Sequence, residues 1–292
     1  MTTFLKLPKE FSFDECLVFL DRSSNECLHY VQGRNVRKLL KVENELVLFE
    51  ISENKSRLKI ETLNSISTDL NLNPISEYIL EWFDLKTDIK PFYKVVYSNY
   101  LIKKLATKYY GLRLIGIPDL YEALCWAIIG QQINLNFAYT LKRRFVEVFG
   151  NKIHFNDTNY WLFPTPQDFL NVTVNDLMKL QFTGRKSEYI IELAHKFNLG
   201  ELPNKLELKR LSYQEAKNTL LKTRGVGEWT ADYVLMKCLR FPEAIPVGDV
   251  GLQNAIKNVL NLQSKPSIQE INKLSSEWEG WQTYSAFYLW RS

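Results

Sequence analysis

Cysteine and histidine are scarce in this chain of 292 residues, which contains four cysteines and three histidines. The cysteines are scattered and form no CxxC pair, so the sequence predicts neither a disulfide framework nor a zinc site. No histidine is spaced with a second ligand residue. We therefore expect no metal ion bound by side chains.

Long hydrophobic runs are also missing. No stretch approaches the roughly 20 apolar residues that a membrane-spanning helix requires, and residues 1–13 lack the basic and apolar segments of a signal peptide. We therefore expect a cytoplasmic or otherwise intracellular protein, associated with the nucleoid if the source is prokaryotic, and no membrane partner.

The charge that is present is unevenly distributed. Residues 1–90 carry 12 lysine and arginine residues and 15 aspartate and glutamate residues, whereas the remainder carries 25 basic and 18 acidic residues. A net positive charge attracts polyanions such as nucleic acid. A basic binding surface is therefore expected in the C-terminal two-thirds of the chain.

Residues 1–75 have the pattern of a small mixed domain. Alternation of apolar and polar residues in LVLFEI and LKIET indicates an antiparallel sheet with one face in water. A short helix is expected at the segment 13–19. Strands are expected at 27–31, 36–41, 45–51 and 57–62.

From about residue 75 onward, apolar residues recur at intervals of three and four, and no further β-hairpin is indicated. The predicted fold class is therefore α+β, with an antiparallel N-terminal domain followed by a mostly α-helical body. Helices are expected at 77–85, 94–110, 120–150, 167–180, 186–198, 213–223, 228–239, 252–260, 268–276 and 281–290.

The predicted helix 120–150 is interrupted by the sequence GQQIN. Gly130, Gln131, Gln132 and Asn134 stand where a continuous apolar helix face would be expected. Such an interruption is typical of a turn between two helices, and it is equally compatible with a polar tip that protrudes from the surface.

A glycine turn, Gly225–Val226–Gly227, separates two predicted helices. Unpaired amides without side chains can bind a phosphate oxygen at the start of the second helix, but a tight turn between helices has the same pattern. Asp249 follows about twenty residues later in the loop PVGD. This acid either caps the next helix or serves as a lone functional carboxylate.

The segments LKTRGVGEWTADYVL and FPEAIPVGDVGL together resemble the signature of the helix–hairpin–helix DNA glycosylase superfamily, and more narrowly its 3-methyladenine DNA glycosylase II (AlkA-type) family. The segments FDL, GLRLIG, AIIGQQ, FPTPQ and WQTYSAFYLW stand in the family's order. The resemblance implies an N-terminal TBP-like α+β domain at residues 1–90. It also implies a helical domain made of residues 91–118 and 243–292, and a helix–hairpin–helix domain at residues 119–242.

The same resemblance implies roles for the residues of the glycine turn and the loop. Asp249 matches the catalytic aspartate, which stabilises positive charge on the sugar and helps water to attack it. Gly225, Val226 and Gly227 match the hairpin that holds a DNA phosphate, usually with a monovalent cation at the backbone of the two glycines. Arg224 replaces the family's usual proline and is expected to add a phosphate contact.

Aromatic residues complete the implied site. Trp229 stands where bifunctional relatives carry the lysine that forms a Schiff base, so the chain is expected to be monofunctional. Tyr233, Trp290 and Phe19 match the other aromatic residues of the base pocket. Each of these rings, taken alone, is also typical of core packing.

The interruption in the helix 120–150 matches the wedge that fills the gap left by a flipped nucleotide. Gln132, where the best-known arrangement has leucine, is expected to act as this wedge, with Ile133 beside it. No iron–sulfur cluster is expected, because no cysteine follows Cys238.

The implied function is the removal of alkylated purines, such as 3-methyladenine or 7-methylguanine, from double-stranded DNA by a monomer that needs no cofactor beyond the cation. Two alternatives remain: an 8-oxoguanine glycosylase of the same superfamily, and a non-catalytic binder of damaged DNA. Trp229 argues against the first, and Asp249 together with the aromatic residues argues against the second.

Overall fold

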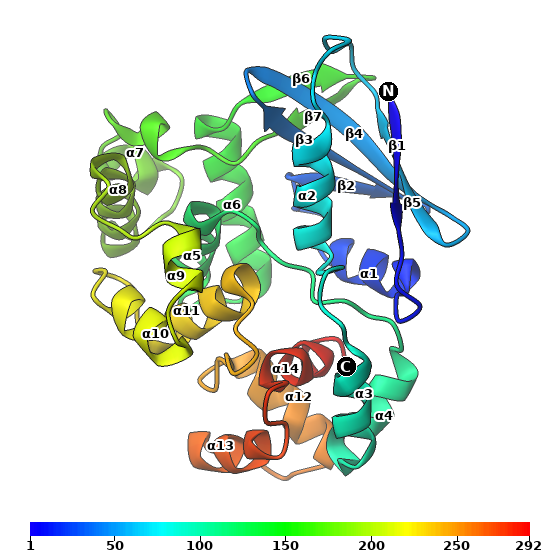
Figure 1. Cartoon of the computed structure of the whole chain (residues 1–292). Coiled ribbons are helices and arrows are strands. Elements are labelled where there is room, and N and C mark those ends of the chain that lie inside the picture. Colours follow the sequence, from blue (N-terminus) through cyan, green and yellow to red (C-terminus); the bar gives the residue numbers. More distant parts are fainter.

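A five-stranded antiparallel sheet forms the N-terminal part of the protein in the computed structural model, which describes residues 1–292 (Figure 1). The strand order is β1-β5-β4-β3-β2. In the central strand β4, Val47, Leu48, Phe49 and Ile51 are fully buried. The strands are β1 (Thr2–Lys6), β2 (His29–Gln32), β3 (Asn35–Val42), β4 (Glu45–Asn54) and β5 (Arg57–Thr62).

Two helices accompany the sheet. Helix α1 (Phe13–Leu20) begins at Ser12, whose hydroxyl accepts the amide of Glu15 at 3.3 Å, a typical N-cap. Helix α2 (Asn73–Trp82) packs its Trp82 ring against the ring of His29, with centroids 5.4 Å apart. The N-terminal antiparallel domain predicted from the sequence is confirmed.

The rest of the chain is mostly helical, as the sequence predicts. Its helices are α3 (Lys90–Tyr97), α4 (Tyr100–Lys108), α5 (Leu120–Gly130), α6 (Leu135–Phe149), the 3₁₀ turn η1 (Pro166–Phe169), α7 (Val174–Lys179), α8 (Gly184–Leu199), α9 (Lys205–Lys209), α10 (Tyr213–Leu221), α11 (Glu228–Val234), the π-helical segment η2 (Leu235–Leu239), α12 (Val250–Leu260), α13 (Ile268–Ser276) and α14 (Gln282–Trp290). None of these helices combines the length and the apolar character that crossing a bilayer demands.

The expectation that no β-hairpin follows residue 75 is wrong. Strands β6 (Lys152–Phe155) and β7 (Thr158–Trp161) form a two-stranded hairpin. Asn156 and Asp157 between them both have positive φ, 45° and 59°, which is the conformation of a tight hairpin turn. The hairpin docks on the sheet, where the Tyr30 hydroxyl donates to the carbonyl of Asn159 at 3.0 Å.

Three predicted helices are broken by residues that cap a new one. The expected helix 94–110 is divided because Asn99 accepts the amide of Ile102 at 3.1 Å and starts α4. The expected helix 167–180 is divided between η1 and α7, since Thr173 caps α7. The expected helix 120–150 ends at Gly130 and resumes after the cap Asn134.

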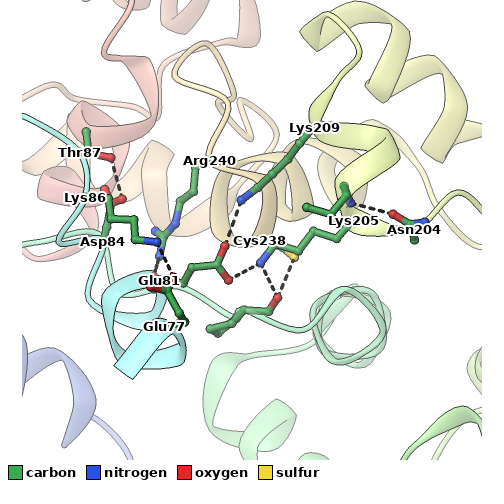
Figure 2. Close-up of polar contacts among 12 residues, drawn as sticks. Glu77, Glu81, Asp84, Lys86, Thr87, Asn204, Lys205, Lys209, Cys238 and Arg240 are labelled. Atoms are coloured by element: carbon green, nitrogen blue, oxygen red, sulfur yellow. Dashed lines mark hydrogen bonds and ion pairs between the residues drawn. The ribbon is translucent and has the colours of Figure 1, made fainter. Parts of the chain in front are cut away.

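The N-terminal part and the helical body share one hydrophobic core of 76 buried residues. Polar contacts reinforce the junction, as Figure 2 shows at the end of α2. The carboxylate of Glu81 pairs with Lys205 at 2.7 Å and Lys209 at 3.1 Å, and its carbonyl accepts from Arg240. A buried ion pair joins Lys142 of α6 to Glu26 at 2.5 Å. The division into three domains with the boundaries given above stays a prediction.

Candidate active site

Asp249 lies at the N-cap of α12, so it does cap a helix. Its Oδ1 accepts the amide of Leu252 at 2.7 Å. The same oxygen accepts the indole N–H of Trp290 at 2.9 Å, and Oδ2 accepts the indole N–H of Trp229 at 3.0 Å. The cap and the functional interpretation are therefore compatible, because three N–H donors fix the carboxylate at the wall of a cleft.

Three of the aromatic residues form one wall of this cleft. The rings of Trp229 and Tyr233 are stacked, with centroids 5.5 Å apart, and Tyr233 lies 6.0 Å from Trp290. The hydroxyl of Tyr233 accepts the indole N–H of Trp126 at 2.8 Å. Burial raises the pKa of Tyr233 to about 12, so its ring is neutral. The wall is rigid, electron-rich and uncharged.

Phe19 also lines the cleft, but its ring is covered. The guanidinium carbon of Arg22 lies 3.9 Å from the centroid of the Phe19 ring, and Phe287 packs 4.6 Å away. Arg22 is held there by its Nε, which donates to the hydroxyl of Tyr139 at 2.6 Å. Phe19 is therefore less available for stacking on a ligand than the three rings of the opposite wall.

The cleft has a volume of about 690 Å³, large enough for a nucleotide. It lies between α1, the α5–α6 turn, α11, α12 and the end of α14. The residues that line it are Val18, Phe19, Arg22, Trp126, Gly130, Ile133, Asn134, Leu135, Ala138, Trp229, Tyr233, Lys237, Asp249, Val250, Gly251, Asn254, Ala255, Asn258, Leu289, Trp290, Arg291 and Ser292.

The turn between α5 and α6 projects one glutamine outward and one inward. Gln132 is exposed and has a φ of +56°, an unusual conformation for a residue with a side chain. Gln131 points toward the hairpin, where its Nε2 donates to the carbonyl of Gly225 at 2.8 Å and to the hydroxyl of Thr230 at 2.9 Å. Ile133 lines the cleft. Both interpretations of GQQIN are therefore compatible with the structure, since it is a helix–helix turn with an exposed polar tip.

The two glycines of the hairpin between α10 and α11 are required for different reasons. Gly225 has a φ of +86°, and a Cβ there would lie 2.4 Å from Cγ of Tyr189. Gly227 has open space around its Cα and caps α11 without a side chain. The amides of Gly225, Gly227 and Glu228 donate to no other group of the chain. They remain available to an anion, while Val226 is buried and anchors the turn.

Arg224 stands apart from the cleft. Its guanidinium pairs with Glu188 at 2.6 Å and Glu192 at 3.1 Å, and it lies over the ring of Tyr189. These partners are on α8, more than thirty residues earlier, so the sequence alone gives no indication of them. The side chain is 54% exposed.

The region 125–280 matches the family model of the HhH-GPD superfamily base excision DNA repair proteins. The chain belongs to this superfamily. Residues 5–124 match the N-terminal domain of 8-oxoguanine DNA glycosylase. The resemblance predicted from the sequence is confirmed, and this HhH-GPD protein is a member of the DNA glycosylases of base excision repair.

A DNA-3-methyladenine glycosylase from Bacillus subtilis (strain 168) is 43% identical to this HhH-GPD protein over 290 residues, which span 98% of the chain and 95% of the relative. DNA-3-methyladenine glycosylase 2 from Escherichia coli (strain K12) is 24% identical over 77% of the chain and 75% of the relative. The solved 3-methyladenine DNA-glycosylase from Archaeoglobus fulgidus has a TM-score of 0.85 at 22% identity, covering 99% of this chain and 97% of that one. At that identity the structural likeness shows the fold alone.

Several residues that line the cleft were not predicted from the sequence, among them Arg22, Trp126 and Lys237. Arg22 and Trp126 come from segments without a motif of their own. Lys237 lies in the π-helical segment η2, and such segments occur often at functional sites. Burial, with the nearby charges of Arg22 and Arg240, lowers the pKa of Lys237 well below its usual value.

Proposed function

We propose that the protein is a monofunctional glycosylase that flips alkylated purines, such as 3-methyladenine or 7-methylguanine, out of duplex DNA and hydrolyses the N-glycosidic bond. The observation that carries this proposal is the position of Asp249 beside a neutral aromatic wall. An electron-rich ring attracts a stacked cation by about 0.5–2 kcal/mol, and alkylation at N3 or N7 makes the purine cationic. The same charge makes the base a better leaving group.

Asp249 is proposed to act on the sugar. As the bond to the base breaks, positive charge develops on the sugar ring, and a fixed carboxylate stabilises it without reorganising. The carboxylate also orients a water molecule and accepts its proton as oxygen bonds to C1′. The donors Trp229 and Trp290 support this role, since they hold the carboxylate in place.

The absence of lyase activity is also proposed. Lys237 is the only lysine that lines the cleft, and its side chain is 3% exposed. Its Nζ donates to the carbonyl of Ile115 and lies 4.6–4.7 Å from the ring centroids of Phe19 and Phe287. We expect no strand nicking and no covalent trapping by borohydride. Trapping of the wild type would overturn the monofunctional assignment, and its loss or persistence in Lys237→Met would show whether Lys237 or another amine is responsible.

Duplex DNA is the proposed ligand of the hairpin and the wedge. The free amides of Gly225 and Gly227 suit a phosphate oxygen. Gln132, with Ile133 beside it, is proposed to fill the gap left by the flipped nucleotide. Arg224 can exchange its two exposed ion pairs for a phosphate, because such pairs contribute only about 0–1 kcal/mol. One subunit is proposed to suffice for binding and excision.

A monovalent cation at the hairpin remains part of the proposal. No cluster of acidic, cysteine or histidine side chains suits a metal ion, so backbone carbonyls would have to bind the cation. The carbonyl of Gly225 accepts from Gln131, and that of Gly227 accepts the amide of Ala231 at 2.9 Å. The carbonyl of Val226 accepts no backbone hydrogen bond and fits the cation better.

Excision of 8-oxoguanine is the second candidate, because the N-terminal 120 residues match that family's domain. Base release from duplexes that contain 3-methyladenine, 7-methylguanine, hypoxanthine or 8-oxoguanine separates the candidates. We expect release of the two alkylated bases by the wild type and none by Asp249→Asn, which still binds the duplexes. Asparagine also caps helices, so the variant should fold normally. Preferred release of 8-oxoguanine would reverse the ranking, and no release at all would favour a non-catalytic binder of damaged DNA.

A further inference from the structure

A basic face without acidic residues lies on α3 and α4, outside the cleft. From residue 89 to residue 118 the chain contains no aspartate or glutamate. The exposed lysines of this segment are Lys90, Lys94, Lys103, Lys104 and Lys108, and none of them forms an ion pair within the chain. We call these five lysines the lysine face. Glu277, which accepts from Asn99 at 2.6 Å, lies at its border.

The arrangement on α4 is strongly one-sided. Leu101, Ile102, Leu105 and Ala106 are buried against the body, so the opposite side of the helix faces solvent. That side presents Tyr100, Lys103, Lys104, Thr107 and Lys108, spaced at three and four residues. Tyr100 is 89% exposed. Lysine, tyrosine and threonine side chains are all common phosphate ligands.

The lysine face is connected to the cleft through one aromatic ring. Lys108 Nζ lies 4.9 Å from the ring centroid of Tyr109, and the guanidinium of Arg291 lies 4.6 Å from the same centroid. Arg291 lines the cleft. Helices α4 and α14 are neighbours in Figure 1. Arg291 is itself paired with Glu15 at 3.0 Å, so the unpaired positive charge of this region lies on the lysines of α4, which begin one ring away from the rim of the cleft.

We propose that the lysine face binds the phosphate backbone of the duplex on one side of the lesion. The inference rests on the proposed function, since it requires damaged DNA in the cleft. The rise from Lys103 to Lys108 is about 7.5 Å along the helix, so the contact spans about two base pairs beyond the rim. An acidic protein partner is the competing occupant, and the position of the lysines of α4 beside the cleft favours DNA.

Salt-dependent binding of the full chain to a 25-base-pair duplex tests the proposal. The duplex carries a central tetrahydrofuran abasic analogue. For Lys103→Gln/Lys104→Gln/Lys108→Gln, the slope of log affinity against log salt should fall by about 0.9 for each lysine that contacts a phosphate. The matched control Lys6→Gln/Lys41→Gln/Lys55→Gln removes the same charge from the N-terminal sheet and should keep the wild-type slope. A wild-type slope in the first variant, or an equal loss in the control, would refute the inference.

Two truncated duplexes locate the contact. In each, the duplex ends three base pairs from the abasic analogue, on one side or the other. The difference between wild type and the first variant should vanish on one truncated duplex and persist on the other. Persistence on both would overturn the proposal. Release of 3-methyladenine by saturating enzyme should be the same for both proteins, and failure of the wild type to release it would contradict the proposed function instead.

Discussion

The indole N–H of Trp290 lies 2.9 Å from Oδ1 of Asp249, the oxygen that also accepts the helix-capping amide of Leu252. The last turn of the final helix thus fixes the carboxylate that begins α12. A Cβ at Gly251 would lie 2.9 Å from the same oxygen. The position of the Asp249 carboxylate beside the first turn of α12 therefore also requires a glycine.

Replacing Trp290 by phenylalanine should slow base release while keeping the ring. A hydrogen bond to a charged group contributes about 1.5–3 kcal/mol, and we expect the single-turnover rate on 3-methyladenine DNA to fall about tenfold, which corresponds to about 1.4 kcal/mol. Trp229→Phe removes the bond to the other oxygen and should show a similar loss. Wild-type rates in both variants would mean that the indoles do not position the carboxylate.

The two hairpin glycines should differ when each is changed to alanine. Gly225→Ala forces a side chain into the left-handed region and against Tyr189, and should lower the free energy of unfolding by about 1–2 kcal/mol or more. Gly227→Ala meets no neighbour and should unfold like the wild type, yet bind abasic DNA more weakly, because its methyl group occupies the approach to the free amides. Urea unfolding and DNA titration measure the two effects. Equal DNA affinity of wild type and Gly227→Ala would contradict the phosphate assignment.

The two glutamines of the α5–α6 turn provide another matched pair. Gln131→Leu removes two inward hydrogen bonds and should destabilise the fold by about 1–3 kcal/mol. Gln132→Gly suits the positive φ at that position and should leave stability nearly unchanged, but it removes the exposed tip and should slow base release. Thermal unfolding and single-turnover release distinguish them. Undiminished release by Gln132→Gly would remove Gln132 from the wedge role.

Glu122 should make stability decrease as the pH rises. Burial raises the pKa of this carboxyl to about 7, above its value of about 4.3 in an unfolded chain. Folding then favours the protonated form, so stability is lost between about pH 4.3 and pH 7 and stays lower above that. Glu122→Gln removes the titration. The variant should therefore gain about 3 kcal/mol over the wild type between pH 4.5 and pH 8.

Unfolding free energies of the wild type and of Glu122→Gln, measured at several pH values, test whether the ionisation of Glu122 lowers stability. His29 is a useful reference in the same interior, because burial lowers its pKa to about 4 and its contribution changes in the opposite direction. Both proteins contain His29, so its contribution to the unfolding free energy cancels when the two proteins are compared at the same pH. A constant difference across the pH range would contradict the titration of Glu122.

The residues that the sequence places correctly are those with a local signal. The hairpin glycines, Asp249 and the ring positions Trp229 and Tyr233 belong to one continuous stretch, and the resemblance to the glycosylase family, rather than spacing, assigned them to one site. Lys142 and Glu26 could not be paired in this way, because their contact joins segments 116 residues apart. The partners of Arg224 were hidden for the same reason.

Other misses had a local signal that hydrophobic periodicity concealed. Asn156–Asp157 is a turn dipeptide, and it forms the missed β6–β7 hairpin. Asn99 is a helix cap in the middle of an apolar repeat, so two helices replace the single one expected there. In the first case two short polar residues, and in the second case one, determined the boundary more strongly than the repeat around it.

The bond between Gln131 and the carbonyl of Gly225 has a mechanical consequence. It ties the exposed turn to the hairpin, although the two are 94 residues apart in the chain. On the proposed mode of binding, withdrawing the wedge from the base stack while the hairpin stays on the backbone would have to break this bond. When the enzyme moves along undamaged DNA, the hairpin would then have to release the phosphate at the same time as the wedge leaves the base stack.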